Sequence, residues 1–247
     1  MSEQPTTAAL VGTAGGAGAT RLTAEVGATL ARDDRSVAVL DVAFATQGLA
    51  QHVPGRIETD VVDLVTDDDP RPSDAAVDLR TDTPGRLVAV PSRAPFQALA
   101  RAKTAGAAER FETVLARLDE AFDRVLVDVP PIATNPAVAT VTAAERVALV
   151  APGTERGVDS LQRSRARLTD IGTTDDLAVA NRTTDSPDGS IDLAIPESEA
   201  TAVADAPACL DPDDEFAPAV AALAEELFDD SLDLEFPEPD LVDRLRS

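Results

Sequence analysis

The residues best suited to chemistry lie in one glycine-rich segment near the N-terminus, TAGGAGATR at residues 13–21. Glycines between a strand and a helix let backbone N–H groups converge on phosphate oxygens, and the helix N-terminus adds the positive end of its dipole. Gly15, Gly16 and Gly18 are therefore candidate phosphate-binding residues. Thr20 opens the helix at the position where a hydroxyl can bind Mg²⁺. A glycine-rich turn alone is a weak signal, because tight turns need glycine anyway.

The segment has no lysine, although a phosphate-binding loop of this type usually carries one. The only lysine of the chain is Lys103, far away in sequence. Arg21 is the obvious substitute cation, but it lies about 100° further around the helix than Thr20. We therefore expect it to point away from the position of Ala19. An i,i+4 ion pair with Glu25 is the structural alternative to a phosphate or acidic-partner role for Arg21.

Polar residues also close several of the apolar runs that follow. Asp41 ends the run VAVLD, Asp128 lies in RVLVDV before two prolines, and Asn181 with Arg182 follows LAVA. In a parallel sheet such positions meet at the carboxyl edge, where ligands bind. Acids also cap buried strands without binding anything, and an asparagine can simply turn the chain, so both alternatives stay open.

The alternation of apolar runs with helical periodicity predicts the elements that position these residues. The expected strands are Ala8–Gly12, Val37–Val42, Arg86–Pro91, Arg124–Val129, Arg146–Ala151, Leu177–Asn181 and Ile191–Ile195. The expected helices are Thr20–Arg32, a short one at Asp60–Val65, Ala107–Phe122, Val158–Leu168 and Phe216–Phe228. This order predicts an α/β fold with a doubly wound, mostly parallel sheet of about seven strands and helices on both faces.

The chain organisation follows from the same pattern. Residues 1–228 form one predicted domain, in which residues 53–85 hold the short helix and then an exposed, acidic, proline-containing insertion. Residues 229–247 are expected to be an acidic, flexible C-terminal tail. No apolar run approaches the roughly 20 residues of a transmembrane helix, and no signal-peptide pattern precedes the first strand.

The composition is unusually acidic. Asp and Glu total 45 against 21 Lys and Arg, which gives a formal net charge of −24. Acidity with almost no lysine is typical of a cytoplasmic protein of a halophile, here expected to be haloarchaeal, in which salt screens the self-repulsion. An acidic surface for a basic partner is the alternative. Cys209 and His52 are single residues of their kinds. A disulfide within the chain is thus excluded, and a zinc site has too few ligands.

Taken in order, these motifs resemble the MinD/ParA family of deviant-Walker P-loop ATPases. The family's loop has the form K-G-G-x-G-K-T-T, and residues 14–21 match its frame. Four further segments follow at the family's spacing: residues 40–43 as switch I, Gln47–Leu49, Val125–Pro131 as the Walker B strand ending D-x-P-P, and Ile195–Glu197. Asn181 and Arg182 resemble the pair that meets the adenine. The match covers almost the whole chain except the tail.

The resemblance implies a Mg²⁺-dependent ATP or ADP site. The nucleotide-binding residues would be Gly15, Gly16, Gly18, Ala19, Thr20, Arg21, Asn181 and Arg182. Thr20, Asp41 and Asp128 would hold the Mg²⁺, since hydroxyl and carboxylate oxygens are its preferred ligands.

Three positions depart from the family pattern. Ala14 and Ala19 replace both lysines; in the family the first reaches across a dimer interface to the partner's nucleotide, and the second clamps the β- and γ-phosphates. Ala43 replaces the second switch I acid, which is linked to hydrolysis. Loss of one preorganised donor costs roughly 3–4 kcal/mol, or about 10²–10³ in rate. We expect ATP hydrolysis to be lost or strongly reduced, and catalytic residues cannot be assigned.

Interaction features are few. Arg156, Arg163, Arg165 and Arg167 form a basic stretch, but in so acidic a chain a salt-bridged solvent face is expected rather than DNA binding. Residues 228–247 are acidic and contain two prolines, unlike a basic amphipathic membrane-targeting helix. The expected partners are a second copy across the loop face, as a homodimer, and a protein that the sequence does not identify.

Three functions compete. The preferred one is a degenerate nucleotide-binding regulatory protein that acts through partner binding or dimerisation. The first alternative is an active ATPase for chromosome or plasmid partitioning or cell-division positioning, with Arg21 in place of the lysines. The second is a nucleotide-free scaffold in which the glycine turn is purely structural.

Overall fold

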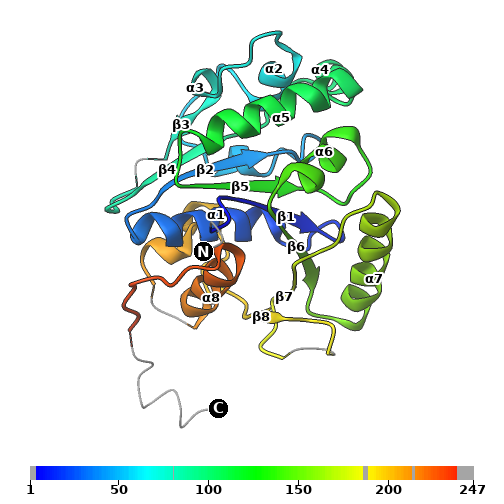
Figure 1. The fold of residues 1–247 in the computed structure, drawn as a ribbon. Coiled ribbons are helices and arrows are strands. Elements are labelled where there is room, and N and C mark those ends of the chain that lie inside the picture. Colours follow the sequence, from blue (N-terminus) through cyan, green and yellow to red (C-terminus); the bar gives the residue numbers. More distant parts are fainter. Residues whose placement is uncertain (1–3, 80, 186–188, 213–214, 238–247) are drawn as a thin grey trace.

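In the described part of the chain, the sheet contains eight strands in the order β3-β4-β2-β5-β1-β6-β7-β8 (Figure 1). The computed structural model describes residues 4–79, 81–185, 189–212 and 215–237. The strands are β1 (Thr7–Gly12), β2 (Ser36–Asp41), β3 (Val77–Asp78), β4 (Arg86–Val90), β5 (Arg124–Val129), β6 (Arg146–Pro152), β7 (Leu177–Asn181) and β8 (Leu193–Ile195). All pairings are parallel except that of β3 with β4. The predicted doubly wound, mostly parallel sheet is confirmed.

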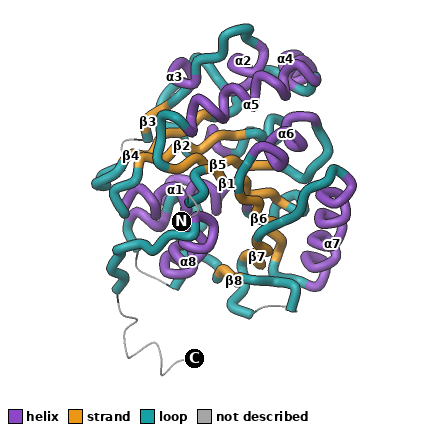
Figure 2. Tube along the Cα trace, viewed as in Figure 1, coloured by secondary structure: helices purple, strands orange, loops and turns teal. Residues whose placement is uncertain are grey.

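Helices cover both faces of this sheet, as Figure 2 shows. They are α1 (Ala19–Arg32), α2 (Val61–Thr66), α3 (Pro72–Ala75), α4 (Phe96–Ala102), α5 (Ala105–Asp119), α6 (Asn135–Ala143), α7 (Glu155–Asp170) and α8 (Phe216–Phe228). Three short 3₁₀ turns lie at Leu49–Gln51, Val203–Asp205 and Ala208–Leu210. None of the helices in the described part of the chain has the length and apolarity needed to span a bilayer.

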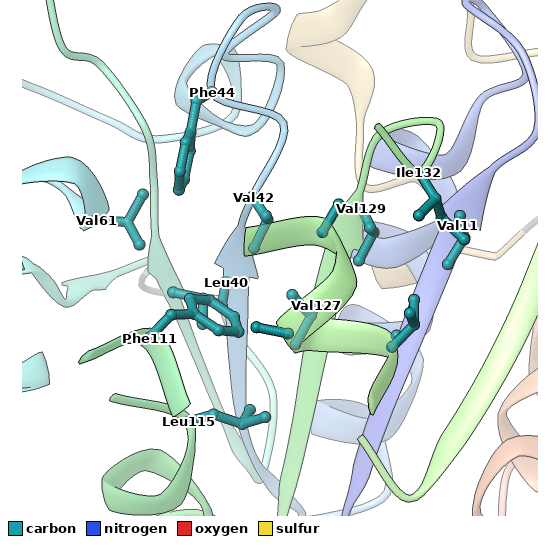
Figure 3. Close-up of a cluster of buried hydrophobic side chains, with 14 of the residues drawn as sticks. Val11, Leu40, Val42, Phe44, Val61, Phe111, Leu115, Val127, Val129 and Ile132 are labelled. Atoms are coloured by element: carbon teal, nitrogen blue, oxygen red, sulfur yellow. The ribbon is translucent and has the colours of Figure 1, made fainter. Parts of the chain in front are cut away.

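The two faces of the sheet are buried in two separate hydrophobic cores. Ala9 and Val11 of β1 point to the core formed with α2, α4, α5, α6 and α7, whereas Ala8 and Leu10 point to the core formed with α1 and α8. This alternation is the period of two that a strand imposes on its side chains. Figure 3 shows the first core, where Phe111 of α5 lies beside Leu40 of β2 and Val127 of β5.

All seven predicted strands are present, but the strand β3 and the helices α3, α4 and α6 were not predicted. The strand β3 has two residues, too few to carry a period-two signal. The helix α6 reads NPAVATVTA, in which Pro, Thr and Val weaken the local helix preference. The helix α4 is only seven residues long. The predicted helix at Ala107–Phe122 begins and ends a little earlier, and the last strand starts at Leu193.

The acidic insertion was expected to be exposed, and this is wrong in part. It contains α3 and β3, and it is fastened to α5 by ion pairs of Asp68 with Arg110 at 2.7 Å and of Asp69 with Arg117 at 2.9 Å. Ala75 is buried in the first core. The many acids of this segment therefore serve in part to hold it on the arginines of α5.

The expected flexible tail begins with a segment that packs on the domain. Asp230 accepts hydrogen bonds from Arg35 at 3.0 Å and from Arg124 at 2.9 Å. Leu232 and Phe236 pack against the second core, and the guanidinium of Arg32 lies 5.3 Å from the centroid of the Phe236 ring. Residue 228 is thus the end of α8, but the segment that follows it still packs against the domain. Residues 238–247 lie outside the described residues.

Candidate nucleotide-binding site

The glycine segment joins β1 to α1 as a tight turn at the carboxyl edge of the sheet. Gly16 has φ 77° and Gly18 has φ 91°, left-handed values that glycine adopts without steric penalty. Gly18 is the N-cap of α1. A Cβ atom there would lie 2.2 Å from the Asn181 Nδ2 atom, so the turn also needs glycine for space. The N–H groups of Gly15, Gly16 and Gly18 have no acceptor among the described residues and are available to an anion.

A cavity of about 410 Å³ opens above this turn. It is lined by Gly12, residues 14–21, Ala43, Thr46, Gly48, Gln51, His52, Asp128–Pro131, Arg182, Thr201–Val203 and Ala206. A smaller cavity of about 150 Å³ adjoins it and is lined by Gly18, Arg21, Leu22, Asn181, Arg182, Pro196–Ser198, Thr201 and Phe216. The two together bring the predicted loop, Asp128 and the Asn181–Arg182 pair to one place.

Thr20 and Asp128 face the larger cavity and contact each other. The Thr20 hydroxyl donates a hydrogen bond to Asp128 Oδ2 at 2.6 Å. Asp41 lies beside Asp128, because the two residues are register partners on β2 and β5. Asp41 does not line the cavity; its carboxylate accepts from the N–H of Ala43 at 2.8 Å and of Ser92 at 3.4 Å. The three predicted metal ligands are adjacent, with only two of them at the cavity surface.

Burial gives this carboxylate pair unusual electrostatics. Asp41 and Asp128 are 0% and 1% exposed. Desolvation raises the pKa of Asp41, and the neighbouring Asp128 raises it further. Desolvation also raises the pKa of Asp128, against the opposing hydrogen bond from Thr20. A buried acid pair with no basic side chain inserted beside it favours either a proton or a bound cation.

The residues present fit a Mg²⁺ ion. The Thr20 hydroxyl and the Asp128 carboxylate are hard oxygen donors that open onto a cavity large enough for water and phosphate ligands. The described residues contain no group of three or more His, Cys, Asp or Glu side chains that could hold an ion alone. A metal at this place would therefore need ligands from a bound phosphate, as Mg²⁺ in nucleotide sites does.

Arg21 forms the i,i+4 ion pair with Glu25 that was expected as the structural alternative to a phosphate-binding role. Its Nε atom lies 3.2 Å from Glu25 Oε1, its guanidinium donates to Ser198 Oγ at 3.1 Å, and it lies 5.7 Å from the Phe216 ring centroid. Glu25 is fully buried and also accepts from the backbone N–H groups of Ala208 and Cys209. The arginine thus compensates a buried charge, although it still lines both cavities.

Asn181 and Arg182 lie against the glycine turn. Asn181 Nδ2 donates to the Ala17 carbonyl oxygen at 2.8 Å, and Asn181 Oδ1 accepts from the Arg182 N–H at 3.0 Å. The Arg182 guanidinium donates to the Gly16 carbonyl oxygen at 3.4 Å. Asn181 lines only the smaller cavity, whereas Arg182 lines both.

The three alanines at the family's charged positions all line the larger cavity. Ala14 lies in the turn, Ala19 is the first residue of α1, and Ala43 follows β2. Their methyl groups bring no charge to the place where phosphates would be held. The charged lining residues of the described cavity are Asp128, Arg21 and Arg182.

One lining residue was not expected from the sequence. His52 follows the 3₁₀ turn at Leu49–Gln51 and lines the larger cavity. Its buried Nδ1 atom has no hydrogen-bond partner. Desolvation lowers the pKa of His52, so the ring is neutral. Its position eleven residues after the end of β2 is the only sequence signal that could have indicated this role. Cys209 is buried beneath α1 in the second core and has a structural role.

The basic stretch on α7 is partly paired. Arg165 binds Asp175 at 2.9 Å, and Arg167 donates to the Ile132 carbonyl oxygen at 3.5 Å. Arg156 and Arg163 are exposed and have no ion pair among the described residues. The expected salt-bridged face therefore applies to Arg165 alone among these four arginines of the described chain.

Solved structures with the same fold are numerous. MinD from Pyrococcus horikoshii, solved with Mg-ADP, has a TM-score of 0.73 at 21% identity over 90% of this chain and 95% of that one. The MinC:MinD cell division protein complex from Aquifex aeolicus gives 0.73 at 20% identity, covering 93% of this chain and 98% of that one. A ParA family ATPase from Chlorobium tepidum gives 0.71 at 15% identity, covering 89% and 98%.

The sequence comparisons are less informative. A scan against protein-family models gave no match, and neither did a search of curated proteins. At these identities the structural likeness establishes the fold, and the chain has the MinD/ParA-type P-loop fold.

Proposed function

We propose that this protein is a nucleotide-binding regulator with lost or strongly reduced ATP hydrolysis. One observation carries the proposal: the glycine turn keeps its left-handed glycines and free N–H groups, and Thr20 with Asp128 lines the cavity above it. These are the groups that bind a phosphate chain and Mg²⁺. The groups that would drive hydrolysis are alanines at positions 14, 19 and 43.

Binding without turnover suits a protein whose output is an interaction. A nucleotide held between the turn and Thr201–Val203 would fix the cavity wall and the exposed Gly15 and Gly16 above it. The bound state could then recruit a second copy across the loop face or another protein. The MinC:MinD complex is a precedent for partner binding by a protein of this fold.

Calorimetry against ATP and ADP, in molar KCl with Mg²⁺, tests the binding step. We expect micromolar binding that is lost in Thr20→Ala, together with phosphate release at background level. Sedimentation of the same samples should show a nucleotide-dependent change in mass. Binding with an unchanged mass would rule out homodimerisation and leave the separate partner.

The two alternatives give different results in the same assays. An ATPase that uses Arg21 would release phosphate and would stop on Arg21→Ala; the ion pair of Arg21 with the buried Glu25 argues against this function. A nucleotide-free scaffold would bind neither ATP nor ADP at millimolar concentration. In that case the proposal is refuted.

A further inference from the structure

Two arginines line the larger cavity in the described part of the chain, and they are bound very differently. Arg21 is held by Glu25, Ser198 and the Phe216 ring. Arg182 has no carboxylate partner among the described residues, is exposed, and donates to the Gly16 carbonyl oxygen of the glycine turn. Of the two charges, only that of Arg182 is uncompensated at the mouth of the turn.

The backbone of Arg182 has an unfavourable conformation, which neighbouring hydrogen bonds maintain. Its φ is 62°, in the left-handed region that residues with a Cβ atom rarely adopt. The N–H of Arg182 donates to Asn181 Oδ1, and Asn181 Nδ2 in turn donates to the Ala17 carbonyl oxygen. The strand end and the glycine turn are thus fastened together, and the strained residue places its guanidinium over the turn. Strain that neighbouring contacts maintain is often associated with a functional position.

The glycine turn itself lacks the lysine that phosphate-binding loops usually carry. A phosphate chain carries several negative charges, and the turn offers it N–H groups but no lysine. Asp128, which also lines the cavity, adds a further negative charge or a bound cation. A guanidinium forms paired, charge-assisted hydrogen bonds to phosphate oxygens, and it does so from a planar group that keeps its charge at any working pH.

We propose that Arg182 binds the phosphate chain of a nucleoside diphosphate or triphosphate and replaces the missing lysines of the turn. This deepens the proposed function and rests on it. Arg182 is then a phosphate-recognition residue, and not the adenine contact that the resemblance implies. The distinction has a direct consequence: loss of Arg182 should weaken the binding of ligands that carry a phosphate chain and leave the binding of adenosine unchanged.

The test measures binding of three probes by calorimetry: tripolyphosphate, ADP and adenosine. In Arg182→Gln, tripolyphosphate and ADP should bind about tenfold more weakly or worse, which is the scale of one charge-assisted hydrogen-bonding group. Adenosine affinity should be unchanged, and Arg182→Lys should recover part of the loss. Arg163→Gln, which removes the same charge from the exposed face of α7, is the matched control and should bind like the unaltered protein.

A second variant separates recognition from folding. Arg182→Gly relieves the left-handed backbone, so it should raise the Tm while it weakens tripolyphosphate binding. A purely structural arginine would instead lower the Tm. Higher salt should reduce the effect of Arg182→Gln, since the guanidinium is exposed to screening.

Several results would overturn the inference. An equal loss of adenosine and ADP affinity would assign Arg182 to the base, and unchanged or tighter tripolyphosphate binding in Arg182→Gln would exclude a phosphate role. In both cases the unaltered protein still binds nucleotide, so the proposed function survives. If the unaltered protein binds neither nucleotide nor tripolyphosphate, both proposals fail.

Discussion

The hydroxyl of Thr20 and the carboxylate of Asp128 are joined by a hydrogen bond of 2.6 Å across the mouth of the glycine turn. The contact connects the first turn of α1 to the end of β5, two elements more than a hundred residues apart in sequence. The hydrogen bond fixes the first turn of α1 against the carboxyl edge of the sheet. It also places one hard oxygen donor from each element at the cavity surface. The neighbouring lining residues Ala14, Ala19 and Ala43 contribute no polar side-chain atoms to the cavity.

The first prediction concerns this pair. Thr20→Val keeps the shape of the side chain but removes the donor, so buried Asp128 loses a hydrogen bond. We expect the free energy of unfolding to fall by about 1–3 kcal/mol, and Mg²⁺-dependent nucleotide affinity to fall at least tenfold. Denaturant titration and calorimetry measure the two effects.

Thr20→Ser is the matched control, because it keeps the hydroxyl and loses only a methyl group. It should retain most of the affinity. A Thr20→Val protein that binds nucleotide and Mg²⁺ as well as Thr20→Ser would show that the hydroxyl is not a ligand.

The second prediction concerns pH. Burial and the proximity of Asp128 raise the pKa of Asp41 from 3.8 to about 8. Between these values the unfolded chain has lost the proton that the folded chain keeps, so the contribution of this group to stability falls as pH rises. The slope for one such group is at most about 1.4 kcal/mol per pH unit.

Asp41→Asn removes this titration. Relative to the unaltered protein, the variant should therefore gain stability steadily from pH 5 to pH 8 in denaturant titrations without metal. Added Mg²⁺ should reduce the difference, since a bound cation favours the ionised carboxylates. A stability difference that is constant over this range would show that Asp41 is ionised throughout, contrary to expectation.

The third prediction separates two glycines of the same turn. Gly18→Ala places a Cβ atom 2.2 Å from Asn181 Nδ2 in a residue with φ 91°, so the Asn181–Ala17 hydrogen bond must break. The left-handed backbone alone costs about 1–2 kcal/mol for a residue other than glycine. We expect a lower Tm and weaker nucleotide binding.

Gly15→Ala is the control, because no atom lies within 4 Å of its added Cβ and its φ is not left-handed. Its Tm should change little. Similar losses in the two variants would mean that the turn is not held in the described conformation.

The fold and the residues around the site could be predicted from the sequence, because the patterns that indicate them are local. Each long parallel strand is a continuous apolar run, which buried strands require, and Asp41 and Asp128 end neighbouring runs, so their proximity follows from parallel pairing. The i,i+4 pair of Arg21 with Glu25 was likewise readable from helix geometry alone.

Other features depend on tertiary contacts that no local pattern encodes. The role of His52 as a cavity residue depends on how the loop after β2 folds back over Thr20. The left-handed backbone of Arg182 follows from the Asn181 side chain, and an arginine gives no sequence signal for it. The packing of residues 229–236 could not be predicted, because an acidic segment looks solvated until Arg35, between α1 and β2, and Arg124 of β5 are placed beside it.

The last prediction tests that packed segment. Asp230 accepts from Arg35 and Arg124, and the side chain of Arg124 is only 8% exposed. Asp230→Asn removes the charge that compensates a largely buried guanidinium, so we expect a loss of about 1–3 kcal/mol in the free energy of unfolding. Asp233→Asn removes the same charge from an exposed position three residues later and should cost little.

Proteolysis should follow the same order, with cleavage after α8 faster in Asp230→Asn, because release of the segment removes Leu232 and Phe236 from the second core. Equal stability and equal cleavage in the two variants would mean that the segment is held by its apolar side chains alone.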